Sequence, residues 1–177
     1  MKTAFRALAA IAALAIPLTA HAQEVRCPQG FESLPTPPSG AERVLAACVR
    51  DPIQMVITAS NAALTPASAE ETDLVQQIAG RIGQQGGSLT PSPVRTETIG
   101  SIAARVADLT GSVNMPDGTT AQIEAMLTML PAGTGTLVIM ALSRDPAHAH
   151  VAPIVRALVP TIAGLGTSPP AWRASGN

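Results

Sequence analysis

The sequence predicts an α+β domain, an antiparallel sheet of about six strands in the chain order β-β-α-β-β-β-β-α, flanked by two helices. Three observations support this fold class. Short apolar or alternating segments follow one another with only short turns between them. One segment has clear helical periodicity, and a second apolar, helix-compatible segment closes the domain. Consecutive strands joined by short turns favour antiparallel pairing, and helices separated in sequence can cover such a sheet.

The first two strands are predicted to form a hairpin. Residues 44–49 are a short apolar run, and residues 50–52 form a turn that contains Pro52. Residues 53–60 then alternate, with apolar side chains at every second position from Ile53. A period of two is typical of a half-buried strand.

A helix is predicted to start at Ser68. This serine can cap the first turn, and Glu71, three residues later, completes a capping box. Apolar residues then recur at helical spacing, at Leu74, Val75, Ile78, Ala79 and Ile82. Gly86-Gly87 is expected to stop the helix.

Four further strands are expected at residues 94–99, 102–110, 119–130 and 137–143. The Gly100-Ser101 pair between the first two is a typical hairpin turn. A second turn covers residues 114–118, and residues 131–136 form the last hairpin loop. The glycines of that loop lead into a strand and no Gly-Lys-Ser/Thr follows, so we do not interpret it as a phosphate-binding loop.

The stretch from Asp145 to Gly164 is expected to be the closing helix, with Pro153 and Pro160 shifting its start or kinking it. Arg156 is the one charge in its otherwise apolar run from 151 to 165. One interpretation buries a broad apolar face on the sheet. The other leaves apolar surface for a partner or a membrane, and a partner is favoured because binding to an anionic membrane needs several basic residues.

The N-terminus reads as a secretory signal peptide cleaved between Ala22 and Gln23. Lys2 and Arg6 form its basic region, and the apolar run after them is too short to cross a bilayer as a helix. We therefore expect a periplasmic or secreted protein with no stable membrane span after cleavage. The expected divisions are a signal peptide (1–22), a Pro-rich segment (23–43), an α+β domain (44–166) and a disordered tail (167–177).

Cys27 and Cys48 are the two cysteines of the chain. In an oxidising compartment such a pair predicts a structural disulfide. This bond would tie the Pro-rich segment to the domain. A CxxC redox motif is absent by spacing, and a two-thiolate metal site has no partners nearby in the sequence.

Removal of Lys2 and Arg6 leaves 9 arginines against 12 acidic residues, a net charge of −3. A mildly acidic chain without a basic run lacks the patch that nucleic-acid binding requires. After cleavage Phe31 and Trp172 are the aromatic residues that remain, so stacking platforms for bases are absent. Trp172 in the tail is a weak candidate for a docking anchor. No cofactor motif is present.

His148 and His150 are the candidate metal ligands. Residues two apart share a face on a strand but diverge on a helix. The pair lies in the expected first turn of the last helix, which argues against both histidines binding one metal ion. Met126, Met129 and Met140 could add soft ligands for Cu(I), but Met126 and Met129 must point to opposite faces of a strand. Core packing explains strand methionines as well.

A nucleophile, an acid and a base could be assembled from Ser143, Asp145 and His148, but these residues are nearly consecutive. Catalytic groups normally converge from separate elements. The segment is better explained as a strand end followed by a helix cap, and no catalytic residue is predicted.

Residues 98–106, Thr-Ile-Gly-Ser-Ile-Ala-Ala-Arg-Val, are similar to the small-residue hairpin that follows the first helix in the PsbP-like superfamily of α-β-α sandwiches. The order of elements from Val44 to Leu165 and the apolar last helix also resemble that group, which includes exported bacterial proteins of the DcrB kind. The resemblance implies a binding or accessory role and no catalysis.

We therefore expect an exported, non-enzymatic binding or accessory protein that acts on another envelope or exported protein. A carrier of a small apolar ligand between sheet and helix is the alternative. A metal-handling protein that uses His148 and His150 is a third.

Overall fold

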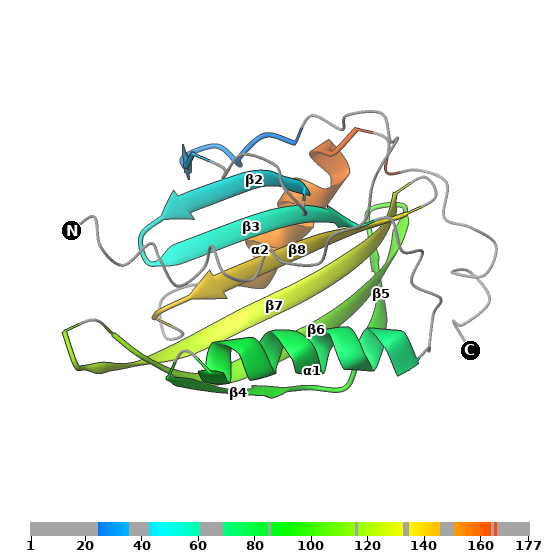
Figure 1. The fold of residues 1–177 in the computed structure, drawn as a ribbon. Helices are drawn as coiled ribbons and strands as arrows, with labels where there is room; N and C mark the ends of the chain where they lie inside the picture. Colours follow the sequence, from blue (N-terminus) through cyan, green and yellow to red (C-terminus); the bar gives the residue numbers. More distant parts are fainter. Residues whose placement is uncertain are drawn as a thin grey trace.

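The structure is a computed structural model, and it describes residues 25–35, 43–60, 69–84, 86–115, 117–132, 135–145, 151–163 and 165. These residues form eight strands and two α-helices, arranged as one sheet with a helix on each face (Figure 1). The elements are β1 (Glu32–Ser33), β2 (Arg43–Arg50), β3 (Ile53–Ser60), α1 (Ala69–Gln84), β4 (Gly87–Pro91), β5 (Arg95–Ile99), β6 (Ile102–Asn114), β7 (Thr120–Ala132), β8 (Gly135–Ser143), α2 (Val151–Leu158) and a 3-10 turn, η3 (Val159–Thr161).

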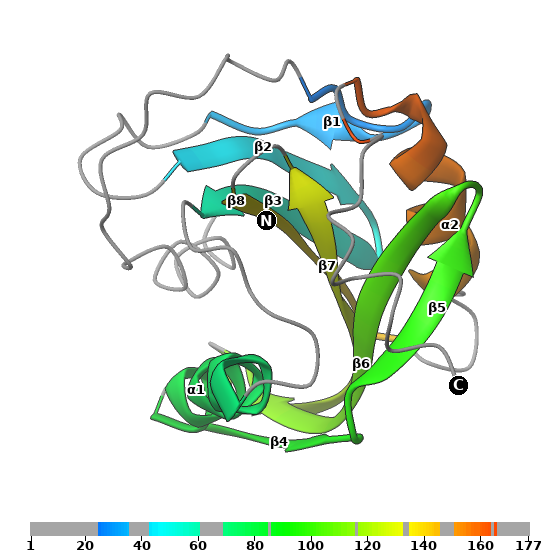
Figure 2. The same ribbon diagram turned by 90° about the vertical axis from the view of Figure 1, so that its right-hand side faces the viewer.

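The strands lie in the order β1-β2-β3-β8-β7-β6-β4, and β5 also pairs with β6. Every pairing is antiparallel. β5 pairs with the first half of β6 and β4 with the second half, so the two short strands share one edge of β6. The last strand, β8, therefore occupies the middle of the sheet, between β3 and β7. Figure 2 shows that the sheet is strongly curved.

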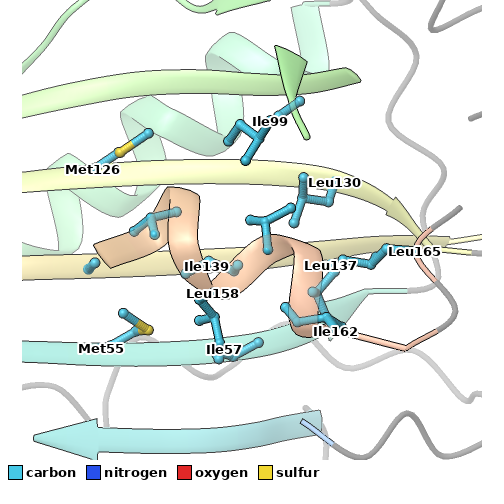
Figure 3. Close-up of a cluster of buried hydrophobic side chains, with 14 of the residues drawn as sticks. Met55, Ile57, Ile99, Met126, Leu130, Leu137, Ile139, Leu158, Ile162 and Leu165 are labelled. Carbon is cyan, nitrogen blue, oxygen red and sulfur yellow. The ribbon is translucent and has the colours of Figure 1, made fainter. Parts of the chain in front are cut away.

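Two separate cores hold the helices on opposite faces of the sheet. β7 shows the division, because Met126 and Leu130 belong to the core under α2, whereas Leu127 and Met129 belong to the core under α1. This alternation follows from the period of two in a strand. α2 packs against β7 and β8, and α1 lies mainly along β4. Figure 3 shows the α2-side core, in which side chains from β3, β7 and β8 meet those of α2.

An antiparallel sheet with two helices is confirmed, but the expected order of elements is wrong in two places. The sequence predicted about six strands, and the structure has eight, because β1 and β4 were not anticipated. Gly86, with φ of +87°, ends the helical segment as expected, but Gly87 already begins β4. The other strands agree with the expected segments to within a few residues, and β3 covers residues 53–60 as predicted.

The last helix is shorter than expected. Within the described residues it begins at Val151, not at Asp145, and it changes to a 3-10 turn at Val159, next to Pro160. Pro153 lies in the first turn of α2, where its missing N–H leaves no hydrogen bond unmade. Ser68, the expected cap of α1, lies outside the described residues. Neither helix of the described chain has the length and apolarity needed for a membrane crossing.

Candidate functional site

Several residues that the sequence singled out lie outside the described part of the chain. These are Ala22, Gln23, His148, His150 and Trp172. The cleavage site, the histidine metal site and the tryptophan anchor therefore stay predictions, as does the tail from residue 167. Among the described residues, no three His, Cys, Asp or Glu side chains group together as a metal site.

The structure joins Cys27 and Cys48 in a disulfide bond. Cys48 belongs to β2 and is 1% exposed, whereas Cys27 lies on the N-terminal segment and is half-buried. We call residues 25–35 the N-terminal cover, because they run along the outer edge of β2. The cover includes β1, whose two residues pair with Val49 and Cys48.

Two further contacts hold the N-terminal cover on the domain. The backbone N–H of Leu34 donates to the carbonyl of Ala47 at 2.8 Å, which extends the β1–β2 pairing by one residue. The Arg50 guanidinium lies 4.6 Å from the centroid of the Phe31 ring, a cation–π contact. Val25, Cys27 and Phe31 are partly buried against the α2-side core. Sequence reasoning anticipated the disulfide but not the strand that it secures.

A chain of ion pairs links α2 to the edge of the sheet. The Arg156 Nε atom on α2 donates to Glu97 Oε1 on β5 at 2.6 Å. Arg95, two residues before Glu97 and on the same face, pairs with Asp108 of β6 at 2.5 Å. The hydrogen bond to Glu97 raises the pKa of the Arg156 guanidinium, against the opposing effect of burial. The period of two in β5 could have shown that Arg95, Glu97 and Ile99 share a face. It could not have shown that Arg156 of α2 contacts Glu97 on that face.

The expected strand end at Ser143 is supported by the structure. Ser143 is fully buried, and its hydroxyl accepts the backbone N–H of Asp145 at 3.1 Å. The next residue, Arg144, forms an ion pair with Asp51 at 2.7 Å, across to the β2–β3 turn. These polar groups close the end of the sheet where β3 and β8 meet.

The three methionines that could have supplied soft metal ligands do not meet. Met126 lies in the α2-side core, while Met129 and Met140 lie in the α1-side core, on the opposite face of the sheet. All three are at most 4% exposed among apolar neighbours. Their positions agree with a packing role.

The apolar residues of the last helix face the sheet. Val151, Val155 and Leu158 are buried, as are Val159 and Ile162 of the following turn. The exposed positions of this segment include Pro153, Arg156, Ala157 and Pro160. The segment therefore buries one apolar face on the sheet, as the first interpretation expects, while Pro153, Ala157 and Pro160 stay exposed.

One polar group lies inside the α2-side core. The Thr128 side chain on β7 is 0% exposed, and its hydroxyl has no hydrogen-bond partner among the described residues. The facing residues on the neighbouring strands are Val106 and Ile139, both apolar. A buried hydroxyl without a partner is costly, because it has lost its hydrogen bonds to water.

The fold and these contacts define an α+β sandwich with a disulfide-bound N-terminal cover. No protein-family model matches the chain, and no curated protein matches it in sequence. Among solved structures, LpqN of Mycobacterium tuberculosis, described as involved in cell envelope biogenesis, shares 16% identity at a TM-score of 0.41, over 76% of this chain and 78% of that chain. PA94 of Pseudomonas aeruginosa, a protein of unknown function described as a putative regulator, shares 16% identity at a TM-score of 0.40, over 87% of this chain and 90% of that chain. Similarity at this level carries no functional information, and the resemblance to the PsbP-like superfamily stays a prediction.

Proposed function

We propose that this chain is an exported, non-enzymatic accessory protein of the cell envelope, which binds another envelope or exported protein. The Cys27–Cys48 disulfide carries the first half of this proposal. Structural disulfides persist in the periplasm and outside the cell, whereas the cytosol keeps thiols reduced. The bond also lies shortly after Ala22, where the signal sequence predicts cleavage.

The charged side chains support a role without catalysis. Arg156, Glu97, Arg95 and Asp108 are engaged with one another at the junction of α2, β5 and β6. Arg144 is likewise paired across the β2–β3 turn. Exposed ion pairs between neighbouring elements are accounted for as surface contacts of the fold, so these side chains do not call for a catalytic role.

Export is tested by fractionating cells that express the full chain and measuring intact mass without reductant. The expected species lies outside the cytosol, begins at Gln23 and weighs about 2 Da less than its dithiol form, the mass of two thiol hydrogens. A full-length cytosolic chain with two free thiols contradicts the proposal. A Cys27→Ser variant is the matched control, since it should be cleaved and exported but show no mass change on reduction.

Partner binding is tested with a photo-crosslinking residue at one exposed position on each helix, Gln77 on α1 and Ala157 on α2. These positions lie on opposite faces of the sheet. A specific partner should give one discrete adduct with an envelope protein from one face and not from the other. Equal labelling of many proteins from both positions contradicts specific binding.

A second candidate function is favoured by Thr128. A carrier of a small apolar ligand between the sheet and α2 would place one hydrogen-bonding group of that ligand against this hydroxyl. Native mass spectrometry of the purified protein should then show a bound small molecule that a Thr128→Val variant retains poorly. An unliganded mass for both proteins removes this candidate.

A further inference from the structure

We infer that one end of the sheet carries a binding face for a neutral polysaccharide. This face lies on the α2 side of the sheet, on the parts of β4, β6 and β7 that lie beyond the α2-side core. The inference goes beyond the proposed function, because the ligand is a glycan and not a protein, and neither depends on the other. Eight side chains make up this surface, which we call the polar face: Ser88, Thr90, Thr110, Ser112, Asn114, Thr120, Gln122 and Glu124.

The strand register brings these eight side chains together. Residues that pair across neighbouring antiparallel strands point to the same side of the sheet. β6 is the middle strand of the three, with β4 on one side and β7 on the other. The pairs form three rows: Ser88–Ser112–Gln122, Thr90–Thr110–Glu124 and Asn114–Thr120.

The neighbouring apolar residues show which side of the sheet these rows occupy. Leu109 of β6 and Ile123 of β7 belong to the α1-side core, so the residues next to them in sequence point away from α1. On the α2 side, Val106 of β6 and Met126 of β7 are the members of the α2-side core that lie nearest to the rows. The polar face therefore starts where that core ends. Figure 1 shows the paired ends of β6 and β7 reaching past the end of β8.

Most of the polar face is open to solvent. Six of its eight residues are exposed, and the other two, Ser112 and Glu124, are half-buried. Within the described chain, one side-chain hydrogen bond joins members of the face, from the Thr120 hydroxyl to Asn114 Oδ1 at 3.3 Å. The other hydroxyl and amide groups of these rows can therefore bind a ligand without breaking contacts of the fold.

The chemistry of the polar face selects a neutral ligand rich in hydroxyl groups. Glu124 is the one charged member, and the next residue of β6 on this side, Asp108, is paired with Arg95 at 2.5 Å. The eight side chains thus include no cation for a polyanion such as a nucleic acid, and the Glu124 carboxylate repels acidic glycans. They also include no aromatic or arginine anchor of the kind that holds protein interfaces. Hydroxyl and amide groups both donate and accept hydrogen bonds, as sugar hydroxyls do.

The spacing of the rows suits a ligand with a repeating structure. Neighbouring strands lie about 4.8 Å apart, and residues of one strand that share a face lie about 6.7 Å apart. The polar face therefore presents hydrogen-bonding groups at regular intervals in two directions. A polysaccharide repeats its hydroxyl groups along its length, so several weak hydrogen bonds can form together and give a useful total affinity.

Co-sedimentation with insoluble chitin and cellulose, two neutral polysaccharides, tests the inference on the purified protein. The protein should sediment with at least one of them, and about 1 M NaCl should not release it, because salt screens charges and leaves neutral hydrogen bonds in place. The variant Thr90→Val/Thr110→Val removes two paired hydroxyls at constant shape. Its affinity should fall about 20-fold, since one lost hydrogen bond weakens binding about fivefold.

Thr98→Val is the matched control. Thr98 is exposed on β5 and pairs with Ala103, so it lies on the opposite side of the sheet from the polar face. This variant should bind as the unchanged protein does. Gln122→Ala, at an exposed position of the face, is a second variant and should lose about fivefold in affinity. Urea unfolding checks that each variant is folded.

Three outcomes overturn the inference. The first is no sedimentation with either polymer. The second is binding that is lost in salt, because charges then hold the complex. The third is an equal loss of affinity in Thr98→Val, because the polar face then has no special part in binding. Fractionation and crosslinking test export and protein binding separately, so either proposal can fail while the other stands.

Discussion

Two glycines near the C-terminal end of α1 give the sharpest test of how this helix packs. Gly80 and Gly83 are both exposed, and a Cβ atom built on either glycine would have no neighbour within 4 Å. Neither position therefore needs glycine for a close approach within the described fold. Each glycine only costs helix stability, because it loses more backbone freedom on folding than alanine does.

Replacement of both glycines by alanine should therefore stabilise the protein. No packing is gained or lost, so the free energy of unfolding should rise by the difference in helix propensity. That difference is about 1 kcal/mol at Gly80, and it is smaller at Gly83 because Gly83 is next to last in the helix, so Gly80→Ala/Gly83→Ala should gain about 1–1.5 kcal/mol. For a chain of this size that corresponds to a rise in Tm of about 2–6 °C. Urea unfolding should show a higher midpoint with an unchanged m-value.

Gly111 on β6 supplies the opposite case. A Cβ atom at this position would lie far inside van der Waals contact distance of the Ser88 carbonyl oxygen, on the neighbouring strand β4. Gly111→Ala must push apart the paired backbones of β4 and β6, and we expect it to lower the free energy of unfolding by more than about 3 kcal/mol. If Gly80→Ala/Gly83→Ala lowers the midpoint, or if Gly111→Ala is tolerated, α1, β4 and β6 cannot be arranged as they are in this structure.

Three further predictions concern single polar groups. Thr128→Val should raise the free energy of unfolding by about 1 kcal/mol, because it removes the unpaired hydroxyl at constant shape. Thr128→Ser keeps the hydroxyl and should lower the free energy of unfolding, and urea unfolding measures both variants. A double-mutant cycle with Arg156→Gln and Glu97→Gln should give a coupling below about 1 kcal/mol, because the Arg156 side chain is 47% exposed. A larger coupling would mean that the pair is less hydrated than its exposure indicates. Hydrogen bonds from the Thr119 hydroxyl and N–H lower the pKa of the Asp117 carboxyl below its usual value. The small stabilising effect of the ionised carboxylate is therefore lost only as the pH falls through that lowered pKa. An NMR titration that gives Asp117 an ordinary pKa would contradict this prediction.

The parts of the fold that could be predicted are those in which one strand or helix carries its own pattern. Alternation in residues 53–60 specified β3 and its buried face, and the same rule placed Met126 and Met129 on opposite faces. The apolar spacing of α1 specified its buried residues, of which Val75, Ile78 and Ile82 lie in the core. Patterns of this kind are local, so a single sequence is enough to reveal them.

The missed elements depend on neighbours that are distant in sequence. β4 contains Gly87 and Pro91, both unfavourable in strands, and it forms because β6 presents a partner with Gly111 at the point of closest approach. β1 has no periodicity to detect and is held by a disulfide to Cys48. The ion pair between Arg156 and Glu97 joins a helix to a strand edge, which no local spacing can indicate.

The central position of β8 determines when this protein can fold. β8 fills the gap between β3 and β7, and Ile53 pairs with Ser143, far away in the sequence. Until β8 has been synthesised, the strands β1–β3 have no neighbour that joins them to β7, β6 and β4. The sheet can therefore be completed only when nearly the whole chain is present. Such long-range pairing folds slowly. A chain built in this order can complete its sheet only after residues 135–143 are available, late in its synthesis.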